Sequence, residues 1–176
     1  MAKATWAIDP THSEIGFKVK HMMFTNVSGK FDLFEALIEN EEENFETSTI
    51  NFSAEVNSIN TGNDDRDNHL RSADFFDVEN FGKLTFKSTN VQKVTEGEYK
   101  ISGDLTIKDV TKNITFDTEY SGLMKDPWGN TKIGLSLNGK INRKEFGLTW
   151  NAALETGGVL VGEDIKLNAE VQFVKQ

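Results

Sequence analysis

Apolar and polar residues alternate with a period of two along almost the whole chain. Ile15, Phe17 and Val19 alternate with charged neighbours such as Lys18 and Lys20, and similar runs return throughout. Because successive side chains of a β-strand point to opposite faces, this pattern predicts strands with one buried and one solvated face. We expect eight strands, over residues 15–19, 27–38, 50–56, 84–86, 99–107, 114–120, 133–141 and 165–173.

The connections between these strands indicate how they pair. Short polar or glycine-bearing segments lie at 39–44, 95–98, 125–130 and 161–164, and short connections favour antiparallel neighbours. Within 27–38 the apolar phase slips after Leu33, which is what a bulge does to a bent strand. Eight such strands form a sandwich or close on themselves. We predict an all-β fold, an eight-stranded antiparallel barrel in a single domain over residues 1–176.

The predicted inward face mixes large and small residues. Ala54, Gly103, Gly139 and Ala169 fall in phase with large apolar residues, and Gly16 lies beside them. One interpretation is that these small residues leave room for an apolar ligand, because eight strands are about the smallest closed number with space for one. The other is that they only accommodate the taper and tight bends of a filled barrel.

Residues 63–72 form the one segment with a convincing helical pattern. Thr61 can cap this helix together with Asp64, acidic residues fill its first turn, and Arg71 lies in its last turn. We expect a solvated helix face on which Asp67 pairs with Arg71.

Two chemical interpretations of this helix deserve comparison with the solvated face. Asp65, His69 and Ser72 share one face in the order of a catalytic triad, but a regular helix supplies neither the tight Ser–His hydrogen bond nor an oxyanion hole. Asp65, Asp67 and His69 imitate alternating calcium ligands, but Leu70 stands where the sharp turn needs glycine. A hydrolase stays as a minor alternative, and no metal site is expected.

Composition excludes several classes of function. The 19 basic residues face 28 acidic ones, which gives a net charge of −9 and disfavours nucleic acids and anionic membrane surfaces as partners. Cysteine is absent, which removes disulfides and thiol nucleophiles. Residues 1–8 do not resemble a secretory signal, and no run approaches the roughly 20 apolar residues of a membrane span. We expect a cytoplasmic protein, or a periplasmic one if the chain is a mature form.

Several segments together resemble the YceI-like family of lipid-binding proteins. They are "WAIDPTHSEIGFKVKHMMFTNVSGKF" at 6–31, "NTGNDDRDNHLRSADFFDVENFGKLTFKST" at 60–89, "GDLTIKDVTKNI" at 103–114, "INRKEFGLTWN" at 141–151 and "GGVLVGEDIKLNAEVQF" at 157–173. The resemblance implies a lipocalin-like barrel, often dimeric, that encloses a polyisoprenoid, an isoprenoid quinone or a fatty-acid-type chain. It implies no catalytic residues and no cofactor other than this lipid. The chain departs from the family pattern at Gly82, Asp109 and Lys132, none of them on the predicted inward face.

Strand phase predicts the residues that would contact such a lipid. His21 continues the inward phase of Phe17 and Val19, so it is the first candidate to meet a polar head group; the alternative is a hydrogen-bonded histidine at the rim. Leu70, Phe75 and Phe76 would frame the pocket, as a plug of one barrel end or as a lid over the ligand. A barrel with a filled core that binds a protein partner stays as the main alternative. The predicted contact residues are Phe17, Val19, His21, Phe52, Phe86, Ile101, Leu105, Phe116, Leu135 and Leu137.

Overall fold

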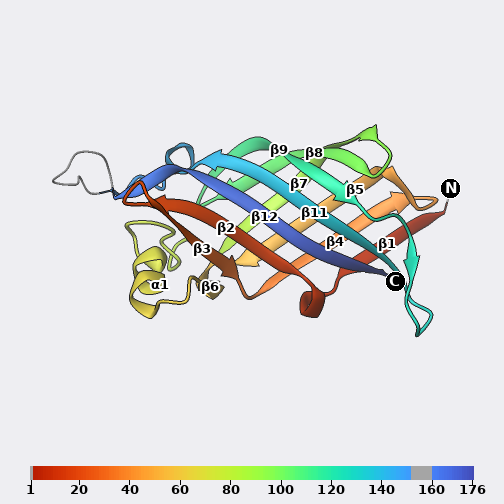
Figure 1. Cartoon of the computed structure of the whole chain (residues 1–176), viewed down its shortest axis with the longest axis horizontal. Coiled ribbons are helices and arrows are strands. Elements are labelled where there is room, and N and C mark those ends of the chain that lie inside the picture. The colour runs from red at the N-terminus through yellow and green to blue at the C-terminus, as the bar shows by residue number, and fades with distance from the viewer. Residues whose placement is uncertain (1, 152–159) are drawn as a thin grey trace.

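The computed structural model describes residues 2–151 and 160–176, whose strands form a closed antiparallel β-barrel with one α-helix near one end (Figure 1). The helix α1 spans Asp64–Arg71, and short 3-10 helices occur at η1 (Pro10–His12), η2 (Val56–Ser58) and η3 (Arg143–Phe146). The strands are β1 (Lys3–Ile8), β2 (Glu14–His21), β3 (Thr25–Phe31), β4 (Phe34–Glu41), β5 (Asn44–Glu55), β6 (Ile59–Asn60), β7 (Lys83–Thr95), β8 (Glu98–Ile107), β9 (Val110–Tyr120), β10 (Met124–Lys125), β11 (Thr131–Asn142) and β12 (Val161–Lys175).

The barrel has eight strands around its circumference, which is the predicted number. Pairing runs in the order β11, β9, β8, β7, β5, β4, β1 and β12, and the pairing of β12 with β11 closes the ring. Two further strands, β2 and β3, continue the ring. β2 pairs with the same edge of β12 as β1 does. β3 pairs with β2 and comes directly before β4 in the chain. The predicted all-β barrel with one short helical insertion is therefore confirmed.

Three local predictions differ from the structure. Residues 27–38 form two strands, β3 and β4, which are separated by Asp32 and Leu33 at the point where the apolar phase slips. The segment 161–164, predicted as a turn, is the start of β12. Its register with β2 shifts between Val161 and Ile165, so the segment is an irregular part of a strand and not a turn. The strand β1 was not predicted, since the first expected strand begins at residue 15.

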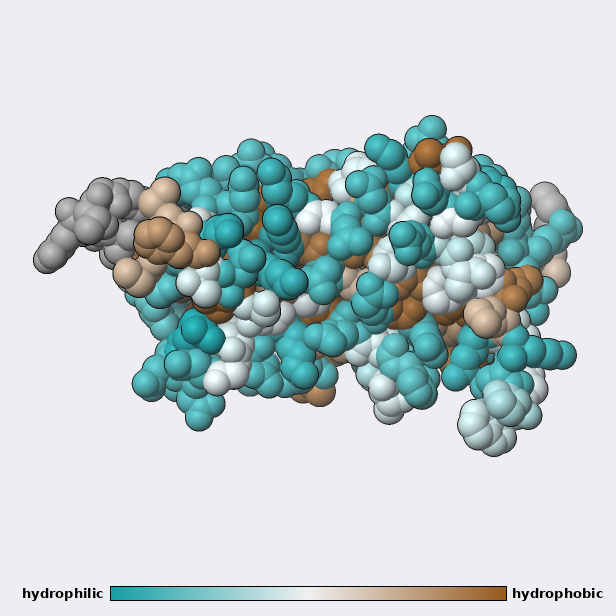
Figure 2. All heavy atoms as spheres, viewed as in Figure 1, coloured by the Kyte–Doolittle hydropathy of each residue, from teal (hydrophilic) through white to brown (hydrophobic). Residues whose placement is uncertain are grey.

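The outward face of the strands is solvated, and the face seen in Figure 2 is mostly hydrophilic with apolar residues showing between polar ones. The inward face forms one main apolar core, in which Trp6, Ile38 and Ile101 are fully buried. Among the described residues, none of the helices combines the length and the apolar character needed to cross a bilayer.

Two of the inward glycines do not leave the empty space that one interpretation of the sequence expected. A Cβ at Gly103 would lie 2.5 Å from the ring of Phe86, and a Cβ at Gly139 would lie 2.8 Å from the ring of Phe116. Aromatic rings already fill the space above both glycines. These two glycines therefore make room for neighbouring rings, whereas Gly16 and Ala169, two further small residues of the predicted set, line an interior cavity.

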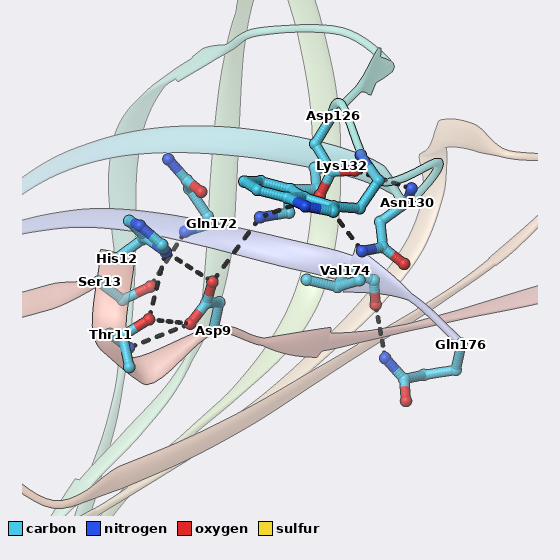
Figure 3. A network of polar contacts seen from close by, with 11 residues as sticks. Asp9, Thr11, His12, Ser13, Asp126, Asn130, Lys132, Gln172, Val174 and Gln176 are labelled. Atoms are coloured by element: carbon cyan, nitrogen blue, oxygen red, sulfur yellow. Dashed lines mark hydrogen bonds and ion pairs between the residues drawn. The ribbon is translucent and has the colours of Figure 1, made fainter.

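A polar network ties η1 to the turn before β11 (Figure 3). His12 Nδ1 lies 2.8 Å from Asp9 Oδ2, and Lys132 Nζ lies 3.9 Å from the same oxygen and 3.6 Å from Asp126 Oδ2. Hydrogen bonds from His12 and then Thr11 lower the pKa of Asp9 from 3.8 to about 2. Lys132 thus supplies the cation between two carboxylates.

Candidate functional site

The middle of the barrel encloses an apolar cavity of about 130 Å³. Its walls come from both sides of the barrel, because strands far apart in sequence turn their inward residues toward one axis. Asn168 supplies the one polar side chain among its described lining residues. Eight of the ten predicted contact residues line this cavity: Phe17, Phe52, Phe86, Ile101, Leu105, Phe116, Leu135 and Leu137.

A second cavity, of about 200 Å³, lies toward α1. The two other predicted contact residues, Val19 and His21, line it. So do Leu70 of α1 and the connector residues Phe75 and Phe76, which were predicted to frame the pocket. All thirteen predicted residues thus border a cavity, and their contact with a ligand stays a prediction.

The two cavities lie next to each other, because five residues line both of them. They share the lining residues Phe17, Phe31, Leu84, Ile107 and Leu167, which we call the partition. Each cavity is smaller than the roughly 300–1,000 Å³ of a typical small-molecule site. A long chain would therefore need both cavities and would have to displace the partition side chains.

The helix beside the second cavity is held differently from the prediction. Asn63, not Thr61, caps α1, and its side-chain oxygen accepts a hydrogen bond from Arg66 N at 3.0 Å. Thr61 instead donates its N–H (2.9 Å) and its hydroxyl (2.5 Å) to Asp67 Oδ1. The predicted pair of Asp67 with Arg71 is wrong, because Asp67 is buried against Thr61, whereas Arg71 donates to the carbonyl oxygens of Asn57 and Ile59.

The triad-like residues of α1 do not form a catalytic relay. His69 Nε2 lies 2.9 Å from Asp74 Oδ2, so its acidic partner is not Asp65. Ser72 Oγ donates to the carbonyl oxygen of His69 at 2.6 Å, which leaves it without a base. The ring of His69 packs edge-on against Trp150, with 4.6 Å between centroids. In the described part of the chain, no group of three or more His, Asp or Glu side chains is placed to hold a metal ion.

His21 lies at the end of β2 and faces the second cavity, as its phase predicted. Its imidazole makes no hydrogen bond to any residue that the structure describes. A role in contacting a head group stays a prediction.

Sequence reasoning missed Arg143, which lines the second cavity and is 1% exposed. It begins η3, where Asn142 caps the turn by accepting from Lys144 N, and Gly147 ends it in the left-handed conformation with φ 78°. Burial lowers the pKa of Arg143 because desolvation disfavours the charged form. Its position directly after an apolar strand gave no signal of burial, since arginines at strand ends are usually solvated.

Comparison with known proteins agrees with this geometry. Residues 6–173 match the YceI-like domain. A UPF0312 protein of Staphylococcus aureus is 41% identical over 169 residues, which cover 96% of each chain. The solved YceI protein of Campylobacter jejuni is 35% identical, with a TM-score of 0.76 over 89% of this chain and 90% of that one. A domain of Saccharophagus degradans described as polyisoprenoid binding shares the fold, with a TM-score of 0.71 at 13% identity over 97% of this chain and 98% of that one.

Proposed function

Because the chain belongs to the YceI-like domain family, we propose that it binds one long apolar lipid inside the barrel and catalyses no reaction. The lipid would be a polyisoprenoid, an isoprenoid quinone or a fatty-acid-type chain, which the protein carries or stores. The observation that carries this proposal is the pair of adjoining cavities along the barrel, of which the first is lined almost throughout by apolar side chains and the second is lined mostly by them.

Transfer energetics support an apolar chain as the ligand. Each CH₂ group moved from water into an apolar interior gains about 0.8 kcal/mol, so a chain of tens of carbons gains more than enough to offset the cost of immobilising it. The neighbouring fold from Saccharophagus degradans, described as a polyisoprenoid binding domain, supports the same class of ligand. The protein then needs no cofactor besides this lipid.

Native mass spectrometry of the freshly purified protein tests the proposal. We expect one extra mass per barrel, which solvent extraction should release as an isoprenoid or acyl lipid. The reference is the same protein after delipidation, which should take up an added quinone, polyprenol or fatty acid with a stoichiometry of one. A barrel that is free of lipid and stays so after incubation with all three would contradict lipid binding and favour a filled barrel that binds a protein partner.

A further inference from the structure

The turn between β2 and β3 presents three consecutive apolar side chains to solvent. Met22, Met23 and Phe24 are 44%, 60% and 84% exposed, and a hydrogen bond from Phe24 N to His21 O (3.2 Å) closes their turn. The turn lies at the α1 end of the barrel (Figure 1), where Figure 2 shows a group of apolar residues at the surface. A single exposed apolar residue is ordinary, but three together at the tip of one hairpin indicate a contact surface.

The backbone of this turn does not favour methionine. Met22 and Met23 have φ angles of 52° and 64°, in the left-handed region that glycine, asparagine and aspartate adopt most easily. The turn between β4 and β5, beside the start of the chain, also has two consecutive left-handed residues, Glu42 (φ 52°) and Glu43 (φ 61°). Polar side chains occupy the same backbone conformation there, so the conformation of the turn does not explain the two methionines.

Lysines line the outer face of the same hairpin. Residues 15–31 include three lysines and no aspartate or glutamate, in a chain whose net charge is −9. Lys18 of β2 lies directly opposite Lys166 of β12, and Lys166 lies directly opposite Lys140 of β11. All three are exposed, and we call them the lysine row. Like charges that face each other across strands destabilise a sheet, so stability does not explain this row either.

Carboxylates neutralise only part of the lysine row. Lys140 Nζ lies 3.5 Å from Asp164 Oδ2. The ion pairs of the described residues include neither Lys18 nor Lys166, and Glu163 is paired with a different lysine. The acidic residues of α1 lie on the other side of the hairpin, because α1 contacts β6 beyond β3, whereas the row crosses from β2 to β12 and β11. The row is therefore a local basic surface on an acidic protein.

We propose that the tip Met22–Phe24 and the lysine row together bind the surface of a lipid bilayer that contains anionic phospholipids. The apolar tip enters the boundary between head groups and acyl chains, and the lysines contact lipid phosphates. Screening limits charge interactions to about 8 Å at physiological salt, so the local row governs this contact more than the net charge does. The inference rests on the proposed function, because a carrier of a water-insoluble lipid has to meet the bilayer that holds it.

This docking surface adjoins the cavities without lining them. The three tip residues and the lysine row line neither cavity, whereas Val19 and His21, just before the tip, line the second one. Met22 N also donates to the carbonyl oxygen of Leu160 (2.8 Å), another lining residue of that cavity. Docking would therefore hold the second cavity close to the bilayer. It should change how fast a lipid enters and leave the equilibrium affinity of the barrel unchanged.

Flotation with vesicles of equal parts phosphatidylcholine and phosphatidylglycerol tests the apolar tip. We expect the parent protein to float with the vesicles, and the double variant Met22→Glu, Met23→Glu to bind them about tenfold or more weakly. This variant should fold, because Glu42 and Glu43 occupy the same left-handed conformation in the other turn. The matched control is Leu123→Glu, Met124→Glu, which removes two side chains of similar exposure (50% and 60%) elsewhere and should float like the parent.

The lysine row is tested with the same vesicles. Lys18→Gln, Lys166→Gln should weaken binding about tenfold or more, because each lysine near an anionic surface contributes to the attraction. Added salt should weaken binding of the parent for the same reason. Lys3→Gln, Lys175→Gln removes the same charge from lysines outside the row, which pair with Glu39 and Glu43, and should bind like the parent.

Lipid uptake separates this inference from the proposed function. Uptake of a polyprenol from the vesicles should slow about tenfold in Met22→Glu, Met23→Glu, whereas the same polyprenol added without vesicles should bind to it as to the parent. A parent protein that does not float, or tip and lysine variants that float like the parent, would overturn the docking surface and leave lipid binding intact. A parent that floats but takes up no lipid by either route would overturn the proposed function and, with it, the carrier role of this surface.

Discussion

At the scale of single residues, glycines under aromatic rings shape the barrel wall. The side chain of Phe17 covers Gly29 directly across from it, Phe86 covers Gly103, and the ring of Phe116 lies over Gly139. A glycine has no side chain to pack in a strand, and a ring laid over it restores the buried apolar contact that the strand would otherwise lack.

We expect Gly103→Ala to lower the free energy of unfolding by roughly 1–3 kcal/mol, because overpacking forces rings and backbone apart. The new Cβ would lie 2.5 Å from both the Lys87 carbonyl oxygen and the Phe86 ring. Gly134→Ala is the control, since its Cβ would meet Ser121 at 3.5 Å, an ordinary contact. Urea titrations of both variants give the comparison. Equal stability of the two would show that the Phe86 ring and its strand move aside without cost.

At the scale of elements, α1 is anchored by a buried carboxylate. Asp67 is 5% exposed and accepts both the N–H and the hydroxyl of Thr61, while Asn63 caps the first turn. These bonds join the start of the helix to the segment after β6 and so position the side chains of Arg66 and Leu70 at the second cavity.

Asp67→Ala should destabilise the protein by roughly 1–3 kcal/mol, because it leaves two donors of Thr61 without their partner. Asp65→Ala removes a carboxylate from the same helical turn, but Asp65 is exposed, so its loss should cost less than about 1 kcal/mol. Thermal unfolding compares the variants, and hydrogen exchange should show faster exchange of α1 amides in Asp67→Ala alone. A similar effect of both changes would mean that the helix dipole and not the buried contact holds α1.

At the scale of the whole molecule, barrel closure creates the interior that a long chain requires. The pairing of β12 with β11 joins the two ends of the sheet, so the inward face of every strand borders one axis. The two cavities lie along this axis with the partition between them. The length of lipid that the barrel can hold therefore depends on the closed ring and on how far the partition side chains move.

Ala169→Phe should block the first cavity and lower the amount of bound lipid per barrel, with the affinity of a long chain reduced about tenfold or more. A cavity of about 150 Å³ holds a benzene molecule, so one phenyl ring nearly fills the 130 Å³ that Ala169 borders. Lys166→Phe adds the same ring to the exposed face of the same strand and should bind lipid like the parent. Native mass spectrometry counts the lipid in each folded variant. Parental stoichiometry in Ala169→Phe would place the chain outside this cavity.

The sequence by itself determined most of the strands, their number around the barrel, the helix near 63–72 and the apolar character of the interior. These features depend on local chemistry: period two, polar turns, helix caps and the choice of inward residues. The strand phase of Phe52, Leu105 and Leu137 was enough to place them at a cavity, because a strand has only two faces.

Only the tertiary structure decided how residues far apart in sequence meet. The space above Gly103 and Gly139 is taken by rings of neighbouring strands. The burial of Arg143 depends on β12, whose carbonyl oxygens at Val161 and Gly162 accept its hydrogen bonds. Register and closure set these contacts, and both follow from the whole sheet rather than from any single segment.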